Sequence, residues 1–187
     1  MRTIALVILL GFLAALLGSP AASCQEKKDL KYVGVKTCGM CHKTGKQGKQ
    51  LDRWKDTKHA AAYKSLLTDK ADQVAKEKGS EKPAAESPEC LKCHVTAYGV
   101  DAKMVDKSFD SKNGVQCEAC HGPGSAYKSM AIMKDKAKAI AAGLKAFKDE
   151  KAIEEFCKTC HNEESPTYKE FKFADMWAKI KHPVPKK

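Results

Sequence analysis

Four copies of one short pattern constrain this chain more than any other feature. Eight of its nine cysteines fall into Cys-x-x-Cys pairs, and a histidine follows the second cysteine of every pair. The pairs are Cys38 and Cys41, Cys90 and Cys93, Cys117 and Cys120, and Cys157 and Cys160; the histidines are His42, His94, His121 and His161. Because the copies recur at irregular intervals, they indicate one repeated binding chemistry rather than a regular structural repeat.

The Cys-x-x-Cys-His pattern is typical of covalent attachment of c-type haem. Two cysteines at this spacing reach the two vinyl groups of one porphyrin as thioethers, and the imidazole of the next residue binds the iron. Zinc sites also use paired cysteines, but they do not require a histidine after every pair. A redox dithiol needs one pair without a systematic histidine, and disulfides do not favour this spacing. We therefore expect four c-type haems, with the eight cysteines as attachment sites and the four histidines as iron ligands.

Four haems would dominate the packing of a 187-residue chain. Aromatic residues make up 7% of it and its mean hydropathy is −0.48, which is low for a core of side chains alone. Porphyrins would supply apolar surface, and their propionates would offset much of the formal net charge of +11. We expect a mainly α fold with long loops, a multihaem cytochrome c whose core is built around four covalently bound haems.

Helical patterns connect the motifs. Alanine-rich composition, apolar spacing, capping residues and a terminating proline predict four helices, over residues 54–67, 126–142, 151–160 and 171–182. Ser125 is the expected cap of the second helix, and Gly143 is its expected end. The first helix contains His59, and the last ends at His182.

There are too few histidines to supply two for each of four irons. Apart from the motif histidines, the sequence holds His59 and His182, and we expect both to be distal ligands. The other two irons would bind methionine or another group, or remain open. Met130 and Met133 share a face of a predicted helix, so one of them is a candidate ligand; packing on a porphyrin is the alternative.

Residues 1–23 have the pattern of a secretory signal peptide, with an uncleaved anchor as the alternative. An apolar run extends from Ile4 to Leu17 and small residues follow it. We expect a mature tetrahaem domain of residues 24–187 outside the cytoplasm. The sequence Ala21-Ala22-Ser23-Cys24 resembles a bacterial lipoprotein box, so a lipid anchor at Cys24 and an incidental thiol both remain open.

Three stretches resemble the tetrahaem cytochrome c-554 family: Cys117-Glu-Ala-Cys120-His121-Gly-Pro-Gly124, Trp54-Lys-Asp-Thr-Lys-His59-Ala60 and Phe171-Lys-Phe-Ala-Asp-Met176. The best-known member of that family accepts electrons from hydroxylamine oxidoreductase in ammonia-oxidising bacteria. The resemblance implies a mostly helical fold with stacked haems, and a periplasmic electron carrier. The chain is shorter than that member and ends soon after its last histidine, so the same partner enzyme is not implied.

The resemblance also implies a set of iron ligands. The family has three six-coordinate haems and one five-coordinate haem, the second along the chain, which here is the haem of His94. His59 and His182 match distal histidines of later haems. The family's remaining distal histidine falls near Ala131, so the resemblance makes the adjacent Met130 the candidate ligand of the first haem.

Three functions are compatible with these features. The main expectation is an electron carrier between donor and acceptor redox proteins, without a catalytic constellation of its own. The alternatives are an enzyme or sensor that binds a small molecule such as nitric oxide at an open iron, and a conduit of stacked subunits. Nucleic acid is not an expected partner, because export separates the two and because lysine, which supplies most of the positive charge, does not bind phosphate bidentately. The sequence does not determine the oligomeric state.

Overall fold

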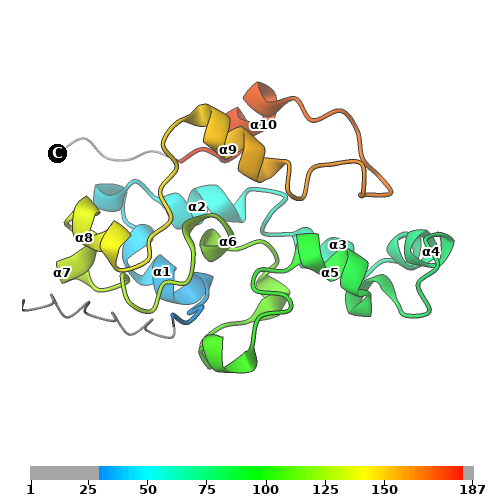
Figure 1. The fold of residues 1–187 in the computed structure, drawn as a ribbon, viewed down its shortest axis with the longest axis horizontal. Helices are drawn as coiled ribbons and strands as arrows, with labels where there is room; N and C mark the ends of the chain where they lie inside the picture. The colour runs from blue at the N-terminus through cyan, green and yellow to red at the C-terminus, as the bar shows by residue number, and fades with distance from the viewer. Residues whose placement is uncertain (1–29, 183–187) are drawn as a thin grey trace, which may run out of the picture.

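The computed structural model describes residues 30–182, in which short helices are joined by long connections (Figure 1). The α-helices are α1 Val35–His42, α2 Gln50–Lys55, α3 Ala62–Ser65, α4 Asp69–Glu77, α5 Pro88–His94, α6 Cys117–His121, α7 Met130–Met133, α8 Lys136–Ala141, α9 Glu150–Cys157 and α10 Phe173–Ile180. The 3-10 helices are η1 Gly45–Gln47, η2 Ala84–Glu86, η3 Ala102–Met104 and η4 Ser111–Asn113. The expected signal segment and Cys24 lie outside the described residues.

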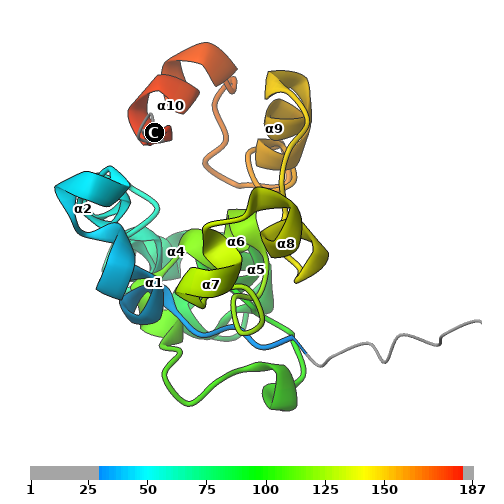
Figure 2. The same cartoon turned by 90° about the vertical axis from the view of Figure 1, so that its left-hand side faces the viewer.

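The described part of the chain confirms a mainly α fold. The β-pairing in this part of the chain is a single bridge. It joins Tyr32, on the segment before α1, to Val105, directly after η3. Among these residues, no helix has both the length and the apolar character needed to cross a membrane. In Figures 1 and 2, α9 and α10 lie together on one side of the molecule, and α4 lies at the end opposite α7 and α8.

A buried carboxylate holds the first and third motifs together. Glu118, inside the third motif, is 1% exposed. Its two oxygens accept hydrogen bonds from the backbone N–H groups of Val33 at 2.9 and 3.1 Å, Gly34 at 2.7 Å and Gly124 at 2.6 Å. These N–H groups belong to the segment before α1 and to the loop after α6. Because bonds to a charged acceptor are about twice as strong as neutral ones, they offset the cost of burying the charge.

A second buried polar side chain extends this connection. Gln116 is 2% exposed; its Oε1 accepts from Val35 N at 2.8 Å and its Nε2 donates to Asp110 O at 2.9 Å. Its own backbone N–H donates to Thr96 Oγ1, just beyond the second motif. The residues that introduce α6 therefore bond to segments that flank two other motifs.

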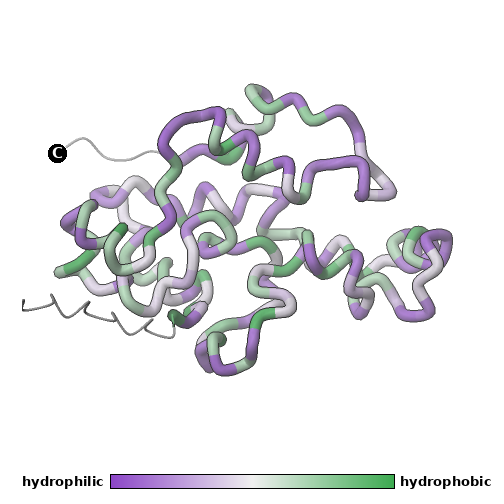
Figure 3. The backbone as a smooth tube through the Cα atoms, in the orientation of Figure 1, coloured by the Kyte–Doolittle hydropathy of each residue, from purple (hydrophilic) through white to green (hydrophobic). Residues whose placement is uncertain are grey.

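Apolar packing within the described residues is limited. One small cluster joins Leu66, Ala75 and Ala84 between α3, α4 and η2, and Leu91 of α5 packs against it. Figure 3 shows apolar residues in short stretches, separated by polar ones, along the whole tube. Several large apolar side chains remain exposed, including Met40 at 68% and Leu67 at 60%. This small core fits a chain whose apolar interior is completed by prosthetic groups.

The prediction of one helix over residues 54–67 is wrong at the centre of that range. Helix α2 ends at Lys55 and α3 begins at Ala62, so His59 lies in the turns between them. The carbonyl of His59 accepts a hydrogen bond from Val115 N at 3.0 Å. The same carbonyl accepts from Ala62 N at 3.2 Å, so the tertiary bond competes with continuation of the helix despite the helix propensity of the alanines.

The prediction of a single helix over residues 126–142 is wrong. It is divided into α7 and α8, whose N-caps are Ser129 and Asp135. Ser125 is not a helix cap, because its hydroxyl accepts from Lys31 N at 2.8 Å. Gly143, with φ +103°, follows the end of α8 as expected. The helices expected over 151–160 and 171–182 are confirmed with shorter bounds as α9 and α10, and His182 lies two residues beyond α10.

We expect Glu118→Gln to lower the free energy of unfolding of the holoprotein by about 2–4 kcal/mol. The amide has one acceptor oxygen, and its NH₂ group would face backbone N–H donors. Denaturant unfolding monitored by circular dichroism measures the change. Glu163→Gln, at an exposed carboxylate, is the matched control and should stay within about 0.5 kcal/mol of wild type. Equal stabilities of the two variants would contradict the anchoring role.

Candidate functional site

Each motif is placed on or beside a short helix. Helices α1, α5 and α6 contain the first three motifs entirely, whereas α9 ends at Cys157 and the turn after it carries Cys160 and His161. Residues three and four positions apart lie on the same face of a helix. Both cysteines and the histidine of a motif on one helix therefore face the same side, as attachment of one porphyrin requires.

The eight motif cysteines are unpaired thiols in the described structure. The zinc interpretation would need two Cys-x-x-Cys pairs gathered around one ion. Within residues 30–182, no group of three or more His, Cys, Asp or Glu side chains is arranged to hold a metal ion.

Two histidine pairs have the spacing of axial iron ligands. The ring centroids of His59 and His161 are 6.0 Å apart, and those of His121 and His182 are 5.9 Å apart. An imidazole nitrogen binds a transition metal at about 2 Å, which puts two rings on opposite sides of one metal with centroids about 6 Å apart. Each pair joins a motif histidine to one of the two histidines outside the motifs. The residues present therefore fit haem at the third and fourth motifs.

The electrostatic environment keeps these imidazoles neutral, which is the form that binds metals. Burial lowers the pKa of His59, and proximity to His161 lowers it further. Burial also lowers the pKa values of His121 and His182, for which the second causes are His182 and His42, respectively. Phe171 stacks on the His161 ring with centroids 4.8 Å apart and planes 18° apart, which holds that ring in orientation.

The proximal histidine of the second motif is oriented by a backbone carbonyl. His94 Nδ1 lies 2.8 Å from Ala62 O, and a carbonyl only accepts, so Nδ1 carries the proton. Its Nε2 is then left for a metal, an arrangement usual for metal-bound histidines. In the first motif, His42 Nδ1 lies 3.3 Å from Gln50 Oε1. Within the described residues, no other histidine ring pairs with His42 or His94 as in the two pairs above.

Contacts between the motifs give their order in space. A hydrogen bond with the Cys117 thiol raises the pKa of Cys38, so the first motif lies against the third. Lys92 Nζ, inside the second motif, lies 2.6 Å from Glu164 Oε2, just after the fourth motif, and the Cys160 thiol helps to raise the pKa of Cys93, so the second motif lies against the fourth.

The third and fourth motifs are also neighbours. Lys145 N donates to His121 O at 2.9 Å, and Lys145 Nζ lies 3.7 Å from the centre of the Phe156 ring on α9, which leads into the fourth motif. From one end to the other, the motifs therefore follow the order first, third, fourth, second.

The methionine candidate begins α7. Its side chain, Met130, is 60% exposed. Figures 1 and 2 both show α7 beside α1, the helix that carries the first motif. Ligation of the first iron by Met130 stays a prediction.

Some residues that build the site were not identified from the sequence. Glu118 has one sequence signal, an acidic residue shortly before the Gly122-Pro-Gly124 turn, whose backbone N–H groups can receive a carboxylate. The carbonyl of Ala62 has no signal, because any residue carries one. Gln50 lies in a stretch rich in lysine, glycine and glutamine, a composition that is typical of a loop.

Comparisons with known proteins identify the family of this chain. The family model described as "Cytochrome c554 and c-prime" matches residues 37–122, which contain the first three motifs. Cytochrome c-554 of Nitrosomonas europaea is 30% identical over 166 residues, which cover 83% of this chain and 68% of that protein. No solved structure matches the chain.

Short helices that carry haem-attachment motifs, together with facing imidazoles, define a c-type cytochrome, an electron carrier with covalently bound haem c and iron. Proteins of this class work with redox partner proteins. More narrowly, the chain belongs to the cytochrome c-554 family.

The turn that holds His59 depends on Gly114, which has φ +71°. A Cβ there would meet His59 O at 2.7 Å and Ala62 N at 3.2 Å. We expect Gly114→Ala to lower the free energy of unfolding by about 2–4 kcal/mol, because left-handed strain adds to a backbone clash. It should also displace His59 and raise the high-spin haem signal in electron paramagnetic resonance.

Gly79→Ala is the matched control, because Gly79 has φ +84° and nothing within 4 Å of an added Cβ. It should cost about 1 kcal/mol and leave the spin state unchanged. An equal loss of stability in both variants would show that the contact with His59 contributes nothing.

Proposed function

We propose that this chain is a periplasmic tetrahaem electron carrier in which each motif attaches one haem. The proximal ligands are His42, His94, His121 and His161. His59 is the distal ligand at the fourth motif and His182 the distal ligand at the third. The facing pairs at 6.0 and 5.9 Å carry this proposal.

Haem c, when bound, supplies a one-electron iron couple. The chain's own residues determine which groups bind the iron and whether a substrate has access to it. At the third and fourth motifs, two imidazoles would hold each iron and would leave no position for a substrate. Neutral, buried histidines bind without first losing a proton. These features favour rapid electron transfer over catalysis.

The order of the motifs supports a linear route. The first and second motifs lie at its two ends, and the third and fourth lie between them. The two paired-histidine sites therefore form the interior of the route, and the ends are the sites where donor and acceptor proteins would exchange electrons. This arrangement assigns different tasks to motifs that look equivalent in sequence.

A second candidate function follows from the second motif. His94 has a fixed tautomer, and within residues 30–182 no second imidazole faces it. An iron held there would keep a position for a small ligand such as nitric oxide. Binding at this end of the route would make the chain a sensor or a reductase as well as a carrier.

Location rests on the sequence pattern and on the family. Members of the family are generally exported to the periplasm, in agreement with the expected signal peptide over residues 1–23. A lipid anchor at Cys24 would hold the domain at a membrane surface.

The defining experiment quantifies haem and carbon monoxide binding in the reduced holoprotein. We expect mass spectrometry of the intact protein to give four covalent haems. Carbon monoxide should bind tightly to about one haem in four. Fewer than four haems in the fully matured protein would overturn the tetrahaem proposal. An absence of carbon monoxide binding would overturn the second candidate function and leave the carrier.

His59→Ala should open the iron at the fourth motif and add one equivalent of bound carbon monoxide, because the imidazole opposite His161 is removed. Titration of the reduced protein measures it. Lys58→Ala, at an exposed neighbour, is the control and should bind as wild type does. If His59→Ala binds no additional carbon monoxide, the assigned pair is wrong.

Met130→Leu tests the first iron separately. If the thioether is its sixth ligand, this variant gains one equivalent of carbon monoxide and loses the absorption of the oxidised protein that depends on iron–methionine ligation. Met176→Leu, on α10, is the control and should leave that absorption unchanged. A Met130→Leu spectrum identical to wild type would leave packing as the role of Met130.

A further inference from the structure

Arg53 is the sole arginine in residues 30–182, and the motifs do not use it. It lies on α2, and its Nη2 donates a hydrogen bond to Ala178 O at 3.2 Å. Within the described residues, Arg53 forms no ion pair with a carboxylate. Its guanidinium is therefore available to bind the backbone of α10.

The carbonyl that Arg53 binds belongs to the last turn of α10. The last four carbonyls of a helix lack partners within the helix, and side-chain donors commonly satisfy them. A guanidinium at this end also meets the negative end of the helix dipole. Arg53 thus stabilises the C-terminal end of α10 through both a hydrogen bond and its charge.

Few hydrogen bonds attach α10 to the rest of the described chain, and its apolar residues Phe173, Trp177 and Ile180 are half-buried. Within residues 30–182, its hydrogen bonds are its own helical ones, a weak contact from Lys179 Nζ to Met176 Sδ, and the bond from Arg53. Within residues 30–182, the bond from Arg53 is therefore the polar link between the end of α10 and α2.

Helix α2, in contrast, is firmly docked on the body of the protein. Trp54 Nε1 donates to Val115 O at 2.8 Å, immediately before the third motif. Leu51 packs so closely on Gly39 of α1 that a Cβ there would lie 2.7 Å from it. Arg53 thus projects from a platform that is fixed relative to His121.

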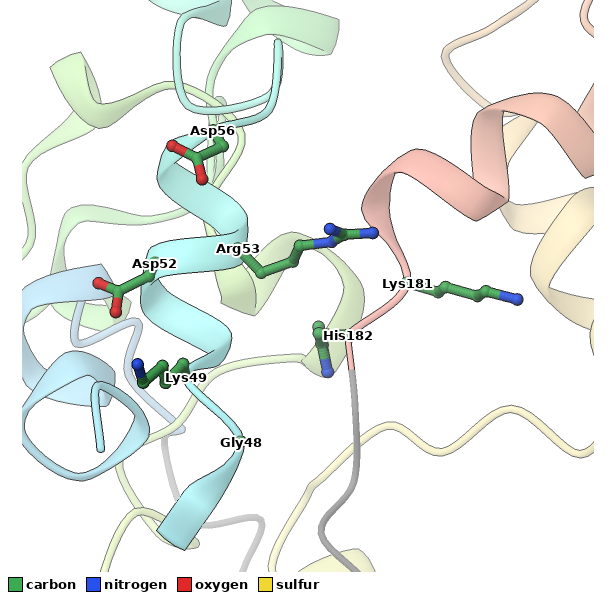
Figure 4. Close-up of a pocket in the computed structure, with 7 residues that line it drawn as sticks. All are labelled: Gly48, Lys49, Asp52, Arg53, Asp56, Lys181 and His182. Carbon is green, nitrogen blue, oxygen red and sulfur yellow. The ribbon is translucent and has the colours of Figure 1, made fainter. Parts of the chain in front are cut away.

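His182 lies across a cavity from this platform. The cavity has a volume of about 570 Å³ and is lined by Gly48, Lys49, Asp52, Arg53, Asp56, Lys181 and His182. In Figure 4, Arg53 reaches from α2 toward the segment that carries Lys181 and His182, while Asp52 and Asp56 point away from it. Arg53 thus connects α2 to the segment that carries the ring facing His121.

We propose that Arg53 is a positioning residue for a distal iron ligand: its bond to the end of α10 holds His182 opposite His121. This inference rests on the proposed function, in which both histidines bind one iron. Without the bond, the end of α10 moves more freely and His182 spends more time detached. The coordination of the third motif's iron is then controlled from α2.

Carbon monoxide titration of the reduced holoprotein measures the detached fraction, because carbon monoxide must compete with His182. The apparent Kd is inversely proportional to the fraction of molecules whose iron is free to bind carbon monoxide, so it falls as that fraction rises. Arg53→Met keeps the aliphatic stem but removes the donors, and we expect it to lower the apparent Kd at this iron about threefold to tenfold. Any tightly binding open iron saturates earlier and is a separate phase.

Three further variants serve as controls for the carbon monoxide titration. Arg53→Lys keeps one charged donor and should restore part of the wild-type Kd. Lys55→Met removes a charge from the same helix at an exposed site and should leave the Kd unchanged. In a His182→Ala background the ligand is already absent, so adding Arg53→Met should have no further effect.

The outcomes separate the two proposals. If His182→Ala gains no carbon monoxide site, the ligand assignment fails. If His182→Ala gains the site but Arg53→Met binds as wild type does, the ligand assignment stands and the role of Arg53 is overturned. A change that Arg53→Met also produces in the His182→Ala background would mean general loosening of the fold, which likewise overturns the positioning role.

Discussion

The carboxylate of Glu118 is the interaction on which the rest of this structure depends. A charge that is 1% exposed is costly unless hydrogen bonds surround it, and here three backbone N–H groups supply them. Two come from the segment before the first motif and one from the loop after the third. Because Glu118 itself lies inside the third motif, satisfying its charge joins two haem-attachment helices that are far apart in sequence. The same bonds fix the first contact of the proposed electron route.

Hydrogen bonds to backbone carbonyls hold the short helices in place, a role that a hydrophobic core has in most proteins. Trp54 bonds to Val115 O, His94 to Ala62 O and Arg53 to Ala178 O. Each joins a short helix to a segment distant in sequence. Helices of four to nine residues have little stability alone. In a c-type cytochrome the haems supply the apolar interior, so attachment and folding are coupled, and these contacts choose which histidine meets which motif.

Helix prediction succeeded where local signals were strong and failed where tertiary bonds compete. Helix α9 has the Asp149 cap and an apolar face, and it forms close to where it was expected. The alanines after His59 favour a helix equally, but the His59 carbonyl accepts a tertiary bond from Val115 N as well as a turn bond from Ala62 N. The segment after the third motif is divided because Ser129 and Asp135 each begin a new helix. In both failures, side-chain caps or tertiary hydrogen bonds at the break compete with a continuous helix.

The sequence by itself determined the four motifs, the chemistry of their ligands and the shortage of histidines, because covalent attachment to a porphyrin requires a short, local spacing. It also carried the resemblance to the cytochrome c-554 family. Tertiary structure alone decided that His59 faces His161 and that His182 faces His121. It likewise decided the order of the motifs and the burial of Glu118. These arrangements depend on contacts through space between segments far apart in the chain, and no local spacing of residues encodes such contacts.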